Sequence, residues 1–468
     1  MAQINERMAK TKKERLIRIS KRGNPSSILK LVTRLGAIGF SILFILIFLS
    51  SVSKSSFNQI WGYIGHGAFD TPTAFFKEMF LLLGIAIGLS PAYKMKFWNI
   101  GGQGQVLIGG LLTTTMMIYM GNAGLKTPFI ILVCLVMAIL AGGLFAAIPA
   151  IAKVQLNANE TLFTLMMNYI AIQLVAFTTH MWNPWAAFGL VNTETHAGYL
   201  PAVGKNEYGV IIIVGVLLMI LMYAYMHYTK HGYELSVVGE SINTAKYVGI
   251  KTKRVIIRTV FLSGAICGLM GFLYVAGVDH TISTGTSGGY GFTAIIVAWA
   301  AQFNPFLMAV ISFLIVLFST GAAGVSNAVP GLNQYVSSIS VGVFLLFIIG
   351  CEFFVNYKIN FNSHITAKIE KFKFAIARKM PKTVAFIEKT QDLIEGIDDK
   401  INDKKEKIQQ KVSGVASVIS KKLKKEEGNT KPNTNENVMA QKSEEKKVIE
   451  PTVTPDAGMK NNAEGDNQ

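Results

Sequence analysis

The side chains that could do chemistry in this 468-residue chain are amides, hydroxyls and a few carboxylates set between long apolar stretches. The first group is Asn99, Gln103 and Gln105, which share a short stretch with three glycines. Glycine permits tight turning, and side-chain amides can satisfy the backbone groups that a turn leaves free. This stretch is either a polar turn or part of a path for a polar solute, and the residues alone leave both interpretations open.

The second group begins with Asn159 and Glu160, just before an apolar stretch, and continues inside that stretch with Asn168 and Tyr169. On a helix, Glu160 and Asn168 would share one face to within about 80° of rotation. Polar groups inside a membrane usually face the bundle interior or a water-filled path, because an amide facing lipid is costly. We therefore expect Asn168 to line a pathway. Glu160 either joins that pathway or only stabilises the positively polarised start of its helix.

The sequence motifs argue against an enzyme. The sequence contains no G-x-x-x-x-G-K-[ST] phosphate loop, no H-E-x-x-H and no C-x-x-C. One G-x-S-x-G match, at Gly285, Ser287 and Gly289, lies between apolar stretches, whereas a hydrolase nucleophile needs a strand-to-helix turn. We predict a glycine-rich turn there. We also predict that the chain has no catalytic residues, no metal site and no cofactor, so that any ATP hydrolysis belongs to a partner chain.

The uneven distribution of charge along the chain indicates which segments form the membrane helices that hold these polar side chains. Charged residues make up 16% of the chain, against about 25% in soluble proteins. Residues 35–356 hold only 13 basic and 9 acidic residues, whereas residues 1–34 are strongly basic and residues 357–468 carry many charges of both signs. We predict an all-α polytopic membrane domain over 35–356, preceded by a basic cytoplasmic segment, 1–34.

About ten apolar segments are expected to build this domain. They are 35–52, 74–92, 104–120, 128–151, 161–179, 209–227, 255–277, 291–303, 304–324 and 334–356. A membrane helix needs about 20 residues, so the segment 291–303 either forms a half-helix or belongs to a re-entrant hairpin. Ten segments place both termini beside the basic loop 228–254, which the positive-inside rule assigns to the cytoplasm. The chain is thus predicted to be a multi-pass protein of the plasma membrane.

The charged C-terminal tail divides into two predicted parts. Within 357–425, apolar residues recur every seven positions, but polar residues interrupt the second apolar position that a coiled coil needs. This favours an amphipathic cytoplasmic helix. Residues 426–468 are rich in Asn, Glu, Lys, Pro and Thr and are predicted to be disordered. Of the net charge of +17, +8 lies in residues 1–34 and +5 in residues 357–468, on either side of the apolar segments. This position indicates contact with anionic membrane lipids and not with nucleic acid.

The basic loop contains a short predicted helix, which Ser241 can cap and Gly249 can stop. Residues 232–254 resemble the cytoplasmic loop of bacterial ABC importer permeases of the branched-chain amino acid, ribose and simple-sugar family. The matching positions are Gly239, Asn243, Ala245, Tyr247, Gly249 and Ile250. Residues 99–105 are similar to the family's N-I-G-x-x-G-Q motif, and residues 159–169 to its N-E-x-x-x-T-L-M-x-N-Y stretch. Gln103 departs from the pattern, since many members carry an acidic residue there.

The resemblance covers residues 75–350 and is strongest to nucleoside permeases. It implies the permease subunit of an ATP-binding cassette importer for nucleosides or simple sugars, with a separate ABC ATPase docked on the 232–254 loop as a coupling helix. It also implies a second permease subunit, often in a heterodimer, and an extracellular substrate-binding lipoprotein. The residues expected to line the substrate pathway are Asn99, Gln103, Gln105, Asn159, Glu160, Asn168 and Tyr169. The alternative is an ion-coupled secondary transporter of small polar solutes, which the energy source of uptake would distinguish.

Overall fold

The computed structural model describes residues 17–22, 27–182, 190–329 and 335–361. The chain divides into two compact units, Met1–Phe372 and Lys373–Gln468, and all of the described residues belong to the first. Residues 357–361, at the start of the predicted helical tail, form a strand. The rest of that tail, including the segment 426–468 that is predicted to be disordered, lies outside the described residues.

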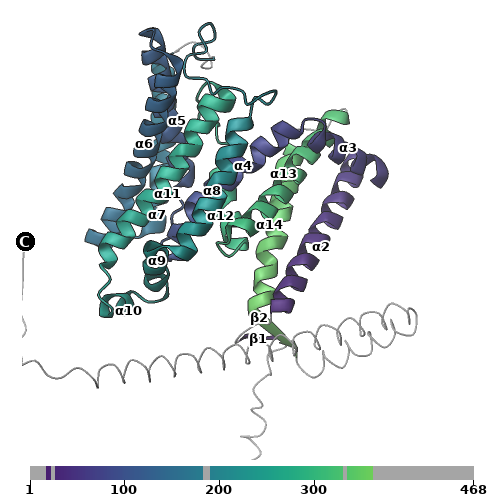
Figure 1. The fold of residues 1–468 in the computed structure, drawn as a ribbon. Helices are drawn as coiled ribbons and strands as arrows, with labels where there is room; N and C mark the ends of the chain where they lie inside the picture. The colour runs from purple at the N-terminus through teal and green to yellow at the C-terminus, as the bar shows by residue number, and fades with distance from the viewer. Residues whose placement is uncertain (1–16, 23–26, 183–189, 330–334, 362–468) are drawn as a thin grey trace, which may run out of the picture. The chain divides into compact units, whose positions relative to one another are not determined.

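Helices make up most of the described part of the chain (Figure 1). They are α2 (Ser27–Ser53), α3 (Phe57–Phe69), α4 (Pro72–Lys94), α5 (Gly102–Asn122), α6 (Thr127–Leu156), α7 (Glu160–Trp182), α8 (Gly209–Tyr228), α9 (Lys230–Glu240), α10 (Ile242–Tyr247), α11 (Thr252–Tyr274) with a π-helical end, η1 (Val275–Asp279), α12 (Tyr290–Ala300), α13 (Pro305–Ala328) and α14 (Tyr335–Asn356). Nine of the described helices are long and apolar enough to cross a membrane. The predicted all-α polytopic membrane protein is therefore confirmed. The cytoplasmic location of the termini stays a prediction.

Two helices add detail to the predicted series of spans. The segment predicted over 291–303 is α12, whose 11 residues extend about 16 Å, half of the hydrocarbon thickness. The residues between the predicted segments 35–52 and 74–92 contain α3, which buries Ile60, Ile64 and Ala68 and leaves Trp61 exposed. Residues four apart lie on one helix face, so three apolar residues suffice to hold this short helix against α13.

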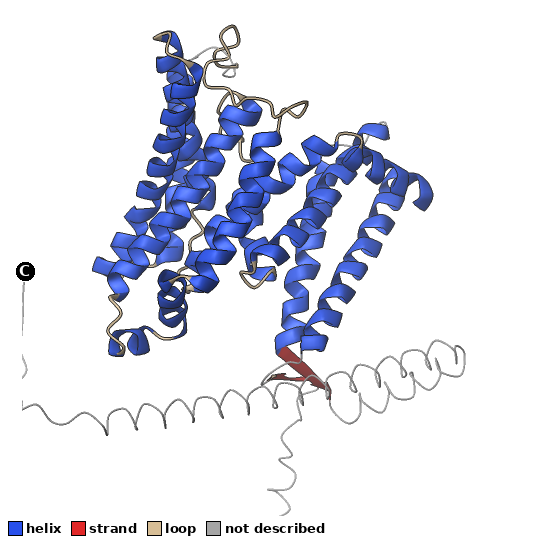
Figure 2. Ribbon diagram, viewed as in Figure 1, coloured by secondary structure: helices blue, strands red, loops and turns tan. Residues whose placement is uncertain are grey.

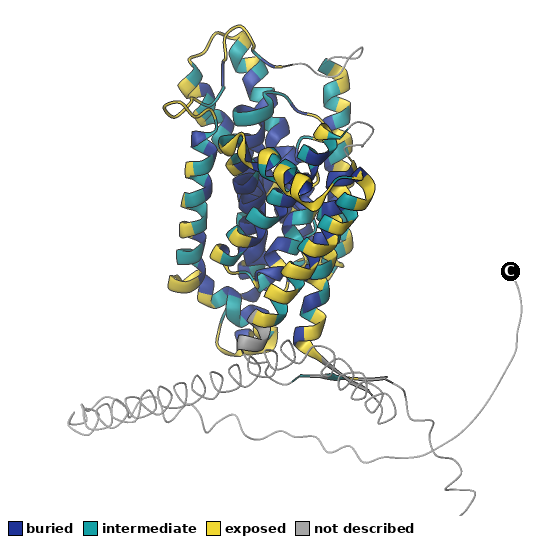
Figure 3. Cartoon of the chain, turned by 90° about the vertical axis from the view of Figure 1, so that its right-hand side faces the viewer, coloured by how far each residue is buried: buried dark blue, intermediate teal, exposed yellow. Residues whose placement is uncertain are grey.

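The centre of the bundle is formed where α11 packs against α4, α5 and α6. Figure 3 shows buried residues gathered inside the bundle and exposed residues on its outer faces. Gly264 and Gly268, one turn apart on α11, lie directly against Gly142 and Ala138 of α6. A Cβ atom at Gly268 would meet the carbonyl oxygen of Ala138. Small residues thus let the two backbones approach closely, as they do at many helix contacts in membranes.

We expect Gly268→Ala to destabilise the protein, because the added methyl group must displace the backbone of α6. Overpacking of this kind costs about 1–3 kcal/mol, which corresponds to a decrease in Tm of about 2–10 °C. Gly342→Ala on α14 is the matched control, since nothing lies within 4 Å of the position of its Cβ. Thermal unfolding of both purified variants in detergent measures the difference. Equal Tm values for the two variants would contradict the close contact.

A second group of contacts holds the first and last spans together (Figure 2). α2 packs along α14, and Arg34 forms an ion pair with Glu352 at 2.6 Å. Beyond these helices, strand β1 (Ile17–Lys21) pairs in antiparallel register with strand β2 (Tyr357–Phe361). The start of α2 and the end of α14 therefore lie side by side, as expected for two termini on the same side of the membrane.

Candidate functional site

The amides of the 99–105 stretch are buried and bonded to one another. The Asn99 side chain donates to Ser263 Oγ on α11 (3.2 Å), and its oxygen accepts from the Gly101 backbone (3.0 Å) and from Gln105 Nε2 (3.1 Å). The hydroxyl of Tyr93 donates to the Asn99 carbonyl at 2.6 Å. These bonds fix the non-helical link between α4 and α5, so the polar-turn interpretation accounts for these hydrogen bonds of Asn99 and Gln105 in the described conformation.

Asn168 joins the same link from α7. Its Oδ1 atom accepts from the Gly104 backbone at 2.8 Å, and its Nδ2 atom donates to the Ile100 carbonyl at 2.9 Å. Asn168 is 1% exposed, whereas the neighbouring Tyr169 is 59% exposed. The structure therefore brings Asn99, Gln105 and Asn168 together and leaves Tyr169 on the outer surface of α7.

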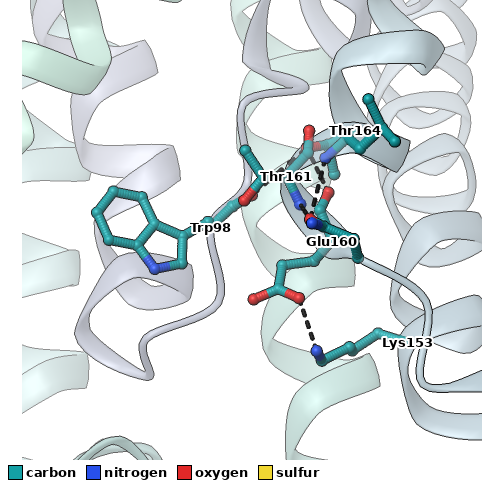
Figure 4. Close-up of polar contacts among 7 residues, drawn as sticks. Trp98, Lys153, Glu160, Thr161 and Thr164 are labelled. Carbon is teal, nitrogen blue, oxygen red and sulfur yellow. Dashed lines mark hydrogen bonds and ion pairs between the residues drawn. The ribbon is translucent and has the colours of Figure 1, made fainter.

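The contacts at the start of α7 show what Asn159 and Glu160 do in this structure (Figure 4). Asn159 Oδ1 accepts from the Thr161 backbone at 3.1 Å, which is the bonding of a helix N-cap. Glu160 forms an ion pair with Lys153 of α6 at 2.7 Å. Thr164 accepts from the Ile100 backbone at 3.1 Å, one turn farther along α7. In this conformation, Asn159 and Glu160 stabilise the helix start and its attachment to α6.

Gln103 links the motif to the glycine-rich loop. Its Nε2 atom donates to Ser287 Oγ, and its Oε1 atom accepts from the Gly291 backbone at 3.1 Å. An ionised carboxylate cannot donate a hydrogen bond, so the carboxylate found in many family members would have to accept from the Ser287 hydroxyl, whereas Gln103 donates to it. Gly288 and Gly289 have φ values of 54° and 78°, as in a tight turn. Ser287 is thus a buried residue of a turn that leads into α12, as predicted.

Above Ser287 lies a polar cavity of about 560 Å³ that the sequence did not reveal. Its lining comes from α4, α11, η1, the glycine-rich loop, α12 and α13, and includes Lys77, Glu78, Tyr274, Asp279, Ser283, Thr286, Ser287, Tyr290 and Ser319. Lys77 and Glu78 are 2.9 Å apart, and the Lys77 ammonium lies 4.9 Å from the centre of the Tyr208 ring. The sequence did contain one signal of this cavity: Lys77 and Glu78 are ionisable side chains inside the predicted span 74–92. Ionisable groups within a membrane usually have a function.

At the other end of α4, the helix pair α9–α10 is firmly attached to the spans. Leu235, Val238 and Ala245 are buried in an apolar cluster with residues at the ends of α4, α6 and α11. Arg258 of α11 donates to Glu234 of α9 at 2.9 Å, and this guanidinium holds the pKa of the Glu234 carboxyl below its usual range. The backbone of α4 leaves no room for a side chain at position 239, where the chain has glycine.

The outer face of this helix pair carries several apolar side chains. Ile242, Tyr247 and Val248 are exposed, and Tyr247 is 93% exposed. The predicted limits of the short helix are confirmed: Ser241 Oγ accepts from the Thr244 backbone, and Gly249 has a φ of 84° that ends the turn. Of the predicted coupling residues, Asn243, Tyr247 and Gly249 face outward, Gly239 and Ala245 are buried, and Ile250 is half-buried.

Comparison with known proteins places this arrangement among transport proteins. The family described as "Branched-chain amino acid transport system / permease component" matches residues 73–349. No solved structure matches the chain.

Three curated relatives each match this chain over most of their own length. Nucleoside ABC transporter permease protein NupB of Lactococcus lactis subsp. cremoris is 24% identical over 62% of this chain and 84% of its own. Glucose ABC transporter permease protein TsgB13 of Haloferax volcanii is 26% identical over 60% of this chain and 75% of its own. Guanosine ABC transporter permease protein NupP of Bacillus subtilis is 28% identical over 52% of this chain and 71% of its own.

Proposed function

This chain belongs to the family of permease components of branched-chain amino acid transport systems, and from that premise we propose that it is one of two membrane subunits of a nucleoside importer. As a family member it is a multi-pass permease subunit of an ABC transporter in the plasma membrane. It works with a separate ATPase and a substrate-binding protein, and it is a component of a transporter and not an enzyme.

The proposed substrate class rests on the relatives. Two of them are named for nucleosides and for guanosine, and a third is named for glucose, which keeps simple sugars as the second class. Both classes are polar and uncharged, and the hydroxyl and carboxylate groups of the cavity above Ser287 are suited to hydrogen-bond them. The proposal includes a second, different permease subunit and a lipoprotein as the extracellular receptor.

The observation that carries the proposal is the exposed helix pair α9–α10, attached to the ends of three spans. Closure of the ATPase on ATP would displace α10 through Ile242 and Tyr247, which are free to dock. Because Leu235 is buried among the ends of those spans, the displacement passes into the bundle. The bundle then alternates between outward- and inward-open states around a fixed path. The energy for transport would come from ATP hydrolysis by the separate ATPase.

The test is ATP-driven uptake by the complex that co-purifies with this chain from its native cells. Proteoliposomes with ATP at the ATPase side are expected to accumulate radiolabelled uridine when the receptor protein is added. Liposomes with a non-hydrolysable ATP analogue are expected to accumulate none. Uptake driven by an imposed proton or sodium gradient in the absence of ATP would instead establish the ion-coupled alternative.

A further inference from the structure

The cavity above Ser287 contains a polar group that the protein leaves unpaired. Tyr274 is 4% exposed, and its hydroxyl has no hydrogen-bond partner among the described residues. Leaving a buried hydroxyl unpaired is costly, and buried tyrosines usually find a partner. The carboxylates of Glu78 and Asp279 and the phenol of Tyr290 are its polar neighbours. Tyr274 lines the cavity, and its hydroxyl, which is covered in the described conformation, would reach an entering molecule once a neighbouring side chain such as Glu78 or Tyr290 moves aside.

The charges of the lining limit what that molecule can be. Two carboxylates, Glu78 and Asp279, face one ammonium group, that of Lys77. A phosphorylated solute would meet a lining of net negative charge. A bare metal cation would meet the Lys77 ammonium, and no group of three His, Cys, Asp or Glu side chains in the described part of the chain is arranged to hold a metal ion. Carboxylates accept hydrogen bonds readily, so an uncharged solute with several hydroxyl groups suits this lining.

We propose that this cavity binds the hydroxyl-bearing part of an uncharged solute. The Tyr274 hydroxyl bonds one of two adjacent ring hydroxyls, which are the 2′- and 3′-hydroxyls in a nucleoside, and Glu78 and Asp279 accept from neighbouring hydroxyls of the ligand. The inference rests on the proposed function and goes further by assigning a binding site within the membrane subunit. The amides Asn99, Gln105 and Asn168 then serve as the support of the site and not as its lining. Through Ser287 and Gln103, the floor of the cavity is bonded to that support.

The cavity lies far from the helix pair that would drive transport. Glu78 is near the start of α4, and Lys94, against which α9 packs, is at its end. They are 16 positions apart, which corresponds to about 24 Å along the helix. A ligand in the cavity and an ATPase docked on α10 would therefore act on opposite ends of the same helix, α4.

The decisive experiment compares uptake of uridine and of 2′,3′-dideoxyuridine by the wild type and by Tyr274→Phe, with the receptor protein unchanged. For each solute, uptake by the variant is divided by uptake by the wild type, so that the contribution of the receptor protein cancels. Loss of one hydrogen bond is expected to reduce uridine uptake about five- to tenfold and to leave uptake of the dideoxy analogue unchanged. Tyr119→Phe, at an exposed tyrosine of α5, is the control.

Equal losses for the two solutes, or no loss for either, would overturn the proposal. A second measurement separates this failure from failure of the proposed function. If the wild-type complex transports no uridine, the proposed substrate is wrong. Thermal stabilisation of the purified chain by added solutes then tests whether the cavity binds hydroxyl groups. Ribose should then raise Tm in the wild type but not in Tyr274→Phe, and ribose 5-phosphate should not raise it in either. Absence of any ribose effect would leave the cavity without the proposed ligand.

Discussion

Replacing both Ile242 and Tyr247 by aspartate is expected to abolish ATP-driven uptake while leaving the permease folded. Both side chains are exposed, and neither contributes to the apolar cluster that anchors α9 and α10. In a docked complex they would be buried, and losing such an apolar anchor costs about 2 kcal/mol or more. Two such losses, about 4 kcal/mol together, reduce docking, and therefore uptake, roughly a thousandfold.

Two measurements on the same preparation test this expectation. Co-purification of the ATPase with the tagged chain should fall in parallel with uridine uptake, while the Tm of the chain alone stays at the wild-type value. Val203→Asp adds an aspartate to the loop 190–208, at the opposite end of α8, and should leave ATPase co-purification unchanged. If the double variant still retains the ATPase and transports at the normal rate, the ATPase docks elsewhere.

The sequence predicted well what depends on neighbours along the chain. The spans follow from hydropathy over about 20 residues. The limits of α10 follow from Ser241 and Gly249, whose roles are set by the backbone within a few residues of each. The short length of α12 was likewise visible in its composition. In all of these cases the determining interactions are local, so a single sequence contains them.

The cavity was not predictable in the same way. Lys77, Tyr274 and Asp279 come from segments nearly 200 residues apart, and only the packing of α4 against α11 brings them together. The partners of Asn168 were also hidden, because they are backbone groups of a distant link and carry no mark in the sequence. The pattern showed that an amide was present in a span. It could not show whether that amide faces a solute or a backbone.

Asn168→Leu is expected to destabilise the folded permease strongly, and this variant separates those two roles. Leucine fills a similar volume but leaves the Gly104 N–H and the Ile100 carbonyl without their partner, at a cost of about 1–3 kcal/mol for each group. Since folded domains are stable by only about 5–15 kcal/mol, we expect a low yield of monodisperse protein and a decrease in Tm. Tyr169→Leu, at the next position, replaces an exposed side chain and should fold normally.

The opposite result would restore the pathway interpretation of Asn168. A structural amide and a solute-binding amide differ in what leucine removes: the first loses the link between α4 and α5 in every state, the second loses only contact with the solute. An Asn168→Leu protein with wild-type Tm, normal ATPase co-purification and no uridine uptake would show that the bonds to Gly104 and Ile100 are dispensable for folding. Asn168 would then belong to the path itself, and the cavity above Ser287 would have to extend to α7 in another state of the transport cycle.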